Sequence, residues 1–150
     1  MNGRIDMIVT FCGHSDFCGN GIYREKIIKL LEEYIKGGAD IYLGGYGGFD
    51  SFALGCCMDY KATHSGTRLW LVTPYLNSPR LDKDSRLYDG TIYPELENIP
   101  RRFAIIHRNR WMVDRADIVI AYISREWGGA YTTYKYALSK KKIVVNLFEA

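Results

Sequence analysis

Short apolar, β-rich runs alternate with segments of helical periodicity along almost the whole chain, and this alternation most constrains its fold. Each apolar run has the length of a buried strand, and each intervening segment repeats apolar residues every three or four positions. The predicted strands are residues 7–12, 41–43, 69–72, 118–122 and 143–147, and the predicted helices are about 27–35, 52–60, 103–113 and 132–139. Strands separated by helices need crossover connections. We therefore expect an α/β fold, a Rossmann-like, doubly wound, mostly parallel sheet of about five strands with helices on both faces.

Length and composition favour one domain over residues 1–150. The 150 residues are 47% hydrophobic and 25% charged, which is typical of a globular chain that buries a single core. All four prolines fall within about 73–100, where no apolar period is sustained. Long irregular segments inside a compact domain are usually functional, so we interpret this one as a lid or a partner-binding segment.

Charge and residue usage exclude several classes of protein. A net charge of +3 is too mild for a dedicated nucleic-acid-binding protein, so nucleic acid is a possible but not a favoured partner. No apolar run is long enough to cross a membrane and the N-terminus lacks a signal-peptide core, so we expect a cytoplasmic protein without a membrane partner. The four cysteines are irregularly spaced and are expected to be reduced. His64 and His107 lack metal-ligand spacing, so we predict no metal, and no cofactor is expected.

Glycine outnumbers proline by 15 to 4, and much of it lies in loops between a predicted strand and a predicted helix. In a parallel sheet these loops meet at the carboxyl edge, where glycine amides and helix N-termini can hold a phosphate. For each loop alone, tight turn formation is the favoured explanation of the glycines, but three such loops at one edge favour an anion site. The candidate ligand-binding residues in them are Gly13, His14, Ser15, Gly44, Gly45, Tyr46, Gly47, Gly48, Gly128, Gly129, Thr132 and Thr133.

Four more residues near this edge are candidates. Asp50 and Ser51 can cap the helix that follows the second loop, and both are also candidate ligand contacts. Thr73 follows the third strand and is a further candidate ligand contact. Glu95, in the irregular segment, could act as a general acid or base if that segment folds over the site.

The glycine patterns do not fit two common nucleotide-binding motifs. No Gly-Lys-Ser/Thr follows the glycine-rich loop, so it is not the phosphate loop of an NTPase. Gly13 is followed by Gly19 and Gly21, which is the wrong spacing for a dinucleotide fingerprint. ATP hydrolysis and hydride transfer therefore lose support.

Residues 101–115 hold five arginines and His107 in a predicted helix. Arg108 and Arg115 are seven residues apart, so they share a helix face. A solvated basic face is the ordinary interpretation of such a run. Single-stranded DNA binding is the functional alternative for it.

The motifs together resemble the SLOG superfamily, and most of all its small bacterial YpsA-like branch. The resemblance rests on VTFCGHSDF, IYLGGYGGFDSFAL, LVTPY, TIYPELENIPRRFAIIHRNRWMVDRADIVIAYI and WGGAYTTYKYA, which span nearly the whole chain. The superfamily includes the Lonely Guy phosphoribohydrolases, DNA-processing protein A and sensor domains for nucleotide-derived signals. It implies a Rossmann-like fold but does not select one activity.

Two Lonely Guy motifs can be compared residue by residue. Arg108, Asn109 and Met112 match R-K-x-x-M with Asn in place of Lys, and the resemblance places Arg108 at the pocket. Gly128, Gly129 and Thr132 match P-G-G-x-G-T-x-x-E, but Trp127 replaces Pro, Tyr131 replaces a Gly and Lys135 replaces the catalytic Glu. A lysine cannot stabilise positive charge developing on a sugar, so the resemblance implies a phosphate cradle without its hydrolytic group.

The leading hypothesis is a protein that binds a nucleotide or nucleotide-derived ligand, of the ADP-ribose or NAD-derived type, as a sensor or sequestering protein. The enzymatic alternative is a divergent nucleotide N-glycosidase, in which Arg108 and a carboxylate such as Asp50 or Glu95 would have to act. Single-stranded DNA binding is the third hypothesis. Resemblance and common symmetry also predict a homo-oligomer.

Overall fold

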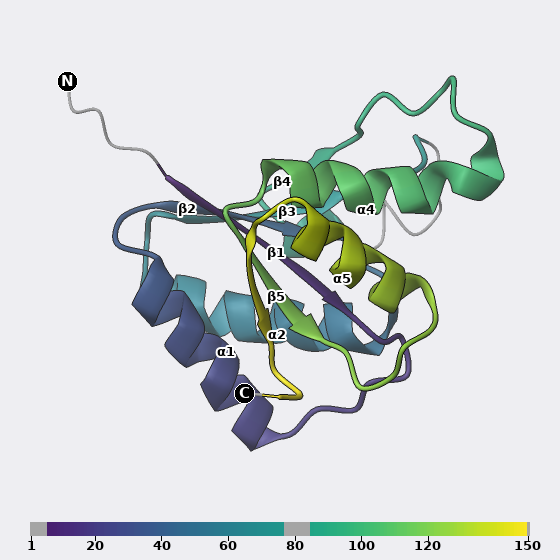
Figure 1. Ribbon diagram of the computed structural model, residues 1–150. Coiled ribbons are helices and arrows are strands. Elements are labelled where there is room, and N and C mark those ends of the chain that lie inside the picture. Colours follow the sequence, from purple (N-terminus) through teal and green to yellow (C-terminus); the bar gives the residue numbers. More distant parts are fainter. Residues whose placement is uncertain (1–5, 77–84, 150) are drawn as a thin grey trace.

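The computed structural model describes residues 6–76 and 85–149, which form a parallel β-sheet covered by helices on both faces (Figure 1). The strands are β1 (Met7–Gly13), β2 (Ala39–Leu43), β3 (Thr67–Val72), β4 (Gly90–Ile92), β5 (Ile118–Tyr122) and β6 (Ile143–Asn146). The helices are α1 (Gly21–Tyr34), α2 (Gly47–Ala62), α4 (Ala104–Arg115) and α5 (Gly129–Ser139), with 3₁₀ turns at Ser85–Leu87 and Arg101–Phe103. The predicted Rossmann-like, doubly wound class is confirmed.

The strand order is β4-β3-β2-β1-β5-β6, and every neighbouring pair is parallel. The chain winds outward from β1 in one direction through β2, β3 and β4, and in the other through β5 and β6. The winding therefore reverses between β1 and β5. Beyond the carboxyl ends of these two strands the helices diverge, which opens the crevice where doubly wound folds bind ligands.

Two apolar layers hold the sheet between its helices. In Figure 1, α1 and α2 lie on one face, and α4 and α5 lie on the other. Val9 and Phe11 of β1 belong to the larger cluster, which includes residues of α1 and α2, whereas Cys12 belongs to the cluster that includes residues of α4 and α5. Because β1 is buried on both faces, it has the continuous apolar run that identifies it in the sequence.

The sheet has a sixth strand that the sequence interpretation missed. β4 lies inside the segment 73–100, which we expected to be irregular, and it pairs with β3 from Trp70 to Val72. Its three residues, Gly-Thr-Ile, contain no apolar run that could have indicated a strand. Gly90 allows the strand to lie close to the Trp70 ring, which a Cβ at this position would overlap. Residues 77–84 of the same segment lie outside the described residues.

Helix starts also differ from the sequence expectation. α1 begins at Gly21 because the Asn20 side chain accepts hydrogen bonds from the amides of Ile22 and Tyr23. α2 begins at Gly47, about five residues before the expected start, so Asp50 and Ser51 lie inside the helix and not at its N-cap. The Asp50 carboxylate instead reaches back and accepts the amide of Tyr46 at 3.0 Å. Among the described residues, no helix is long and apolar enough to span a membrane.

Candidate functional site

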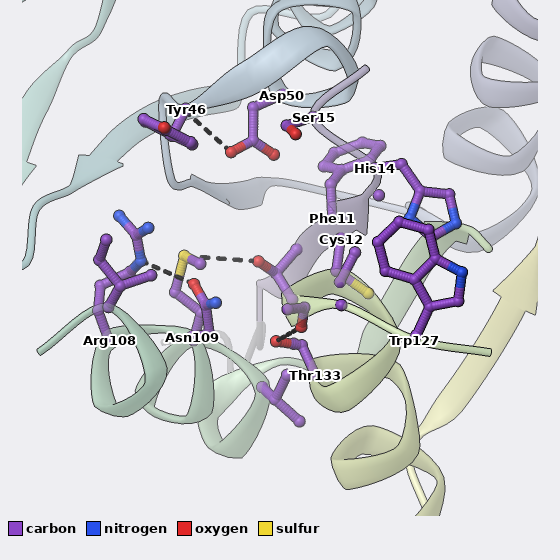
Figure 2. A pocket seen from close by; sticks show the side chains of 18 of the residues that line it. Phe11, Cys12, His14, Ser15, Tyr46, Asp50, Arg108, Asn109, Trp127 and Thr133 are labelled. Atoms are coloured by element: carbon purple, nitrogen blue, oxygen red, sulfur yellow. Dashed lines mark hydrogen bonds between the residues drawn. The ribbon is translucent and has the colours of Figure 1, made fainter. Parts of the chain in front are cut away.

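A cavity of about 350 Å³ lies beyond the carboxyl ends of β1 and β5. Its walls come from the end of β1 and the following loop, from α4, and from the segment that leads into α5. Figure 2 shows Arg108 and Asn109 projecting from α4 on one side, Tyr46 and Asp50 above, and His14 and Trp127 opposite. The candidate residues that line it are Gly13, His14, Ser15, Tyr46, Asp50, Arg108, Gly128, Gly129 and Thr133.

The N-terminus of α5 presents open backbone to this cavity. Its N-cap is Gly128, with φ +96° and no side-chain cap, and a Cβ at either Gly128 or Gly129 would meet no atom within 4 Å. The first intrahelical bond runs from the Thr132 amide to the Gly128 carbonyl at 3.1 Å. The amides of Gly129, Ala130 and Tyr131 donate no hydrogen bond within the described part of the chain. They form an electropositive, unobstructed helix end, which is the kind of backbone arrangement that can bind an anion.

The glycines of the other two loops, those after β1 and after β2, allow close packing against neighbouring residues. A Cβ at Gly13 would overlap the Phe49 ring, and one at Gly48 would overlap the Phe17 carbonyl. The Gly48 amide already donates to the Ser15 carbonyl at 2.7 Å. α1, which follows the first loop, has its N-terminal amides capped by Asn20. Gly13 and Gly48 are therefore held in close packing contacts, whereas Gly128 and Gly129 before α5 have open space around them.

Arg108 is the central cation of the cavity. Its side chain is almost fully buried, and Nη1 donates to the carbonyls of Gly44 and Val72 at 3.0 and 2.7 Å. Its Nε donates to the Asn109 side chain at 2.8 Å. Within residues 6–76 and 85–149, Nη2 has no hydrogen-bond partner. Burial lowers the pKa of Arg108, but Asp50 opposes this change and the guanidinium stays charged.

Arg108 and Arg115 lie seven residues apart on α4 but differ in burial. Arg115 is exposed, and its guanidinium lies 4.0 Å from the centre of the Trp111 ring, whereas Arg108 is buried. Arg108 lines the cavity and Arg115 does not. The neighbouring Met112 is also buried in the cavity wall, where its sulfur accepts from the hydroxyl of Thr10 at 3.7 Å.

His14 supports the loop that precedes α5. Its Nε2 accepts a hydrogen bond from the Ser124 amide at 3.0 Å, which requires the neutral imidazole with the proton on Nδ1. Burial lowers the pKa of His14, and the nearby Arg125 lowers it further. The imidazole is thus a positioning group for the loop between β5 and α5.

Two cations and one carboxylate set the charge of the described cavity lining. The cations are Arg108 and Arg125, and the carboxylate is Asp50. Cys12 also lines the cavity, but burial raises the pKa of its thiol to about 12, so it is not a thiolate nucleophile at neutral pH. The lining therefore suits an anionic ligand with an apolar part.

The remaining candidates lie elsewhere. Gly44, Gly45, Gly47, Gly48, Ser51, Thr73, Thr132 and Glu95 do not line this cavity. The Thr73 hydroxyl donates to the Tyr75 carbonyl at 2.9 Å, which makes it a turn-stabilising residue. Glu95 is exposed, with φ 57°, and is not brought to the site. Gly45 and Ser51 line a second hollow with Asp50 and Tyr88.

The sequence interpretation missed several lining residues, among them Thr10, Ile105 and Arg125. Thr10 lies within the β1 run and carries no signal beyond strand formation. Arg125 could have been suspected from its place after the fourth predicted strand, where ligand-binding loops begin. Among the described residues, no group of His, Cys, Asp or Glu is arranged to hold a metal ion.

No protein-family model matches this chain, and no curated protein matches its sequence. Among solved structures, the chain is similar to DNA processing protein A from Helicobacter pylori, described for its single-stranded DNA binding mode, with TM-score 0.62 and 20% identity. It is also similar to DNA processing protein A from Streptococcus pneumoniae, with TM-score 0.65 and 20% identity. The similarities cover 92% and 93% of this chain, but only 63% and 49% of those proteins.

A third similar structure is the Moco carrier protein of Chlamydomonas rheinhardtii, with TM-score 0.58 and 16% identity over 97% of this chain and 77% of that protein. Identities this low show a shared fold and nothing about the ligand. The chain thus shares a Rossmann-like α/β fold with these proteins, and it has a ligand-sized cavity at the switch point of its sheet.

Proposed function

We propose that this protein binds a nucleotide or nucleotide-derived ligand, of the ADP-ribose or NAD-derived type, and acts as a sensor or sequestering protein. The observation that carries the proposal is one cavity that combines the open N-terminus of α5 with the buried guanidinium of Arg108. Open helix amides favour a phosphate, and the apolar wall beside them suits a sugar and a base. A volume of about 350 Å³ is within the range of small-molecule sites.

The phosphate is assigned to the α5 end of the cavity. α2 also begins near the site, but its first turn carries Asp50, whose negative charge repels an anion there. α5 has no acidic residue in its first turn, and Gly128 and Gly129 leave room for close approach of a phosphate oxygen. Arg108 then lies on the α4 side, where its Nη2 can donate to a second polar group of the ligand.

Binding without fast turnover follows from the residues at the family's catalytic positions. Lys135 stands where a Lonely Guy enzyme has its Glu, and here it is exposed on α5 and does not line the cavity. The carboxylate that does line it, Asp50, accepts the amide of Tyr46 and stabilises the start of α2. We further propose that the chain belongs to the YpsA-like branch and acts in the cytoplasm as a homo-oligomer.

A thermal-shift panel of AMP, NAD, ADP-ribose and cyclic relatives tests the proposal. A ligand that binds only the folded state at about 100 times its Kd adds about 2.7 kcal/mol to the free energy of unfolding. For a chain of this size, that is a rise in Tm of about 5 to 10 °C. A panel in which no nucleotide raises the Tm would contradict the proposal.

A nucleotide N-glycosidase is the second candidate, because the carboxylate of Asp50 and the guanidinium of Arg108 belong to the same cavity. Asp50 would then stabilise the positive charge that develops on the sugar. Chromatography of AMP or NAD after long incubation would show free base, and Asp50→Asn would abolish its release while keeping an oxygen to accept the Tyr46 amide. Intact substrate with the wild-type protein removes this candidate.

Single-stranded DNA binding is the third candidate, and the arginines of residues 101–115 favour it. Arg101, Arg102 and Arg110 are exposed, and each guanidinium lies over an aromatic ring, as in stacking surfaces for single strands. Affinity for an oligothymidine that falls steeply with salt would support this function. Affinity that is absent at low salt would exclude it.

A further inference from the structure

Trp127 is the largest exposed apolar side chain at the mouth of the cavity. Its side chain lines the cavity, yet the residue remains 65% exposed. It occupies the position before the glycine pair that opens α5, where the related Lonely Guy motif has proline. When a flat ring covers an indole that is exposed to water at the edge of a ligand site, the free energy falls, because apolar surface is removed from water.

One face of the indole is covered by a neighbouring guanidinium. The guanidinium carbon of Arg125 lies 4.3 Å from the centre of the Trp127 ring, and its Nη1 donates to both carboxylate oxygens of Asp16 at 3.1 Å. The Ser124 amide is fixed by His14, and the Ile123 amide donates to the Asn146 side chain at 3.0 Å. Hydrogen bonds thus hold three successive residues of the loop that leads to Trp127. The indole is therefore preorganised although it is exposed.

Trp127 is also close along the chain to the amides at the start of α5. Two residues of extended chain span at most about 7 Å, so the ring and the Gly129 amide lie within the reach of one nucleotide. We propose that Trp127, held by Arg125 and Asp16, is the stacking platform for the purine ring of the ligand, and that the phosphate of that same nucleotide binds at the N-terminus of α5. This inference rests on the proposed function and names the class of ligand that the site prefers.

The guanidinium of Arg125 next to the indole should make the platform select neutral rings over positively charged ones. The Arg125 guanidinium already interacts with the π-system of Trp127, so a second cation on this ring meets electrostatic repulsion. A neutral adenine ring stacks without this penalty, whereas the positively charged ring of nicotinamide mononucleotide does not. Both molecules carry the same ribose 5-phosphate, so the comparison isolates the ring.

Calorimetric titration of AMP, nicotinamide mononucleotide and ribose 5-phosphate into wild type, Trp127→Ala and Trp127→Phe tests this inference. Stacking of one base on an aromatic side chain corresponds to about a 5- to 150-fold gain in affinity. We expect Trp127→Ala to lose that factor for AMP and to leave ribose 5-phosphate unchanged, with Trp127→Phe in between. Leu138→Ala, which removes a 46% exposed side chain at the other end of α5, is the matched control and should leave all three affinities unchanged.

The outcomes separate the platform from the proposed function. Equal AMP affinity in wild type and Trp127→Ala overturns the platform while nucleotide binding stands. Equal loss for AMP and ribose 5-phosphate also overturns it, because Trp127 would then shape the loop and not stack on a base. The same holds if nicotinamide mononucleotide binds wild type as tightly as AMP. If wild type binds none of the three, the proposed function fails and the platform fails with it.

Discussion

Replacing Gly129 with Asp should separate the stability of the fold from ligand binding. Gly129 is the first residue of α5, and a Cβ there meets no atom within 4 Å, so a side chain at this position starts in open space. A carboxylate in the first turn of a helix stabilises it by about 0.3 to 1 kcal/mol. The free protein should therefore keep its Tm or gain about 1 to 4 °C.

The same carboxylate occupies the place assigned to the ligand phosphate. Two unit charges about 5 Å apart repel by about 0.8 kcal/mol at the dielectric constant of water and by about 3 kcal/mol at an effective value of about 20. A phosphate monoester carries nearly two negative charges at neutral pH. The Gly129→Asp variant should thus bind a nucleotide at least about tenfold more weakly than the wild-type protein.

Calorimetric titration of the best ligand from the thermal-shift panel measures this loss. Gly129→Asn is the matched control, because it adds the same volume without the charge. Raising the salt concentration should narrow the difference between the Asp and Asn variants, since exposed charges are screened. Equal affinities for the Asp and Asn variants at low salt would refute the assignment of the phosphate to α5.

Three further predictions concern the supporting structure. Gly13→Ala should lower the free energy of unfolding in urea by about 1 to 3 kcal/mol, because its Cβ would overlap the Phe49 ring; an unchanged value would show that the ring moves aside at no cost. Because burial lowers the pKa of His14 below 6.5, the stability that its neutral form contributes is complete above pH 6.5 and is lost as the pH falls toward the lowered pKa. Urea unfolding across that pH range should show a steeper loss for wild type than for His14→Gln, and equal slopes would contradict this account. Iodoacetamide at neutral pH should label the exposed Cys18 and spare Cys12, whose pKa burial raises to about 12; peptide mass spectrometry showing both labelled would contradict the burial of Cys12.

Much of the fold could be predicted from the sequence because central parallel strands are buried on both faces. β1 and β5 have continuous apolar runs, and the helices between strands have clear periodicity. β4 could not be predicted, because an edge strand of three residues that begins with Gly90 has no such run. The start of α1 was missed because its first turn carries few buried residues, although Asn20 is a capping residue type.

The location of the candidate site could be predicted from the sequence. The different roles of its glycines could not. The rule that ligands bind beyond the carboxyl ends of strands pointed to the edge of the sheet where Arg108, Gly128 and Gly129 line one cavity. A glycine that opens a helix end and a glycine that avoids a clash look alike in a sequence. Gly13 is of the second kind, and only its distance to Phe49 in the fold distinguishes it from Gly129.

The central claim is that a nucleotide phosphate binds at the open N-terminus of α5. Two-dimensional amide NMR of the wild-type protein during titration with AMP and with ADP-ribose tests it most directly. The account predicts that the largest chemical-shift changes fall on the amides of Gly129, Ala130 and Tyr131, which donate no hydrogen bond within the described residues. Shifts confined to the exposed arginines of residues 101–115, or no shifts at saturating nucleotide, would contradict it.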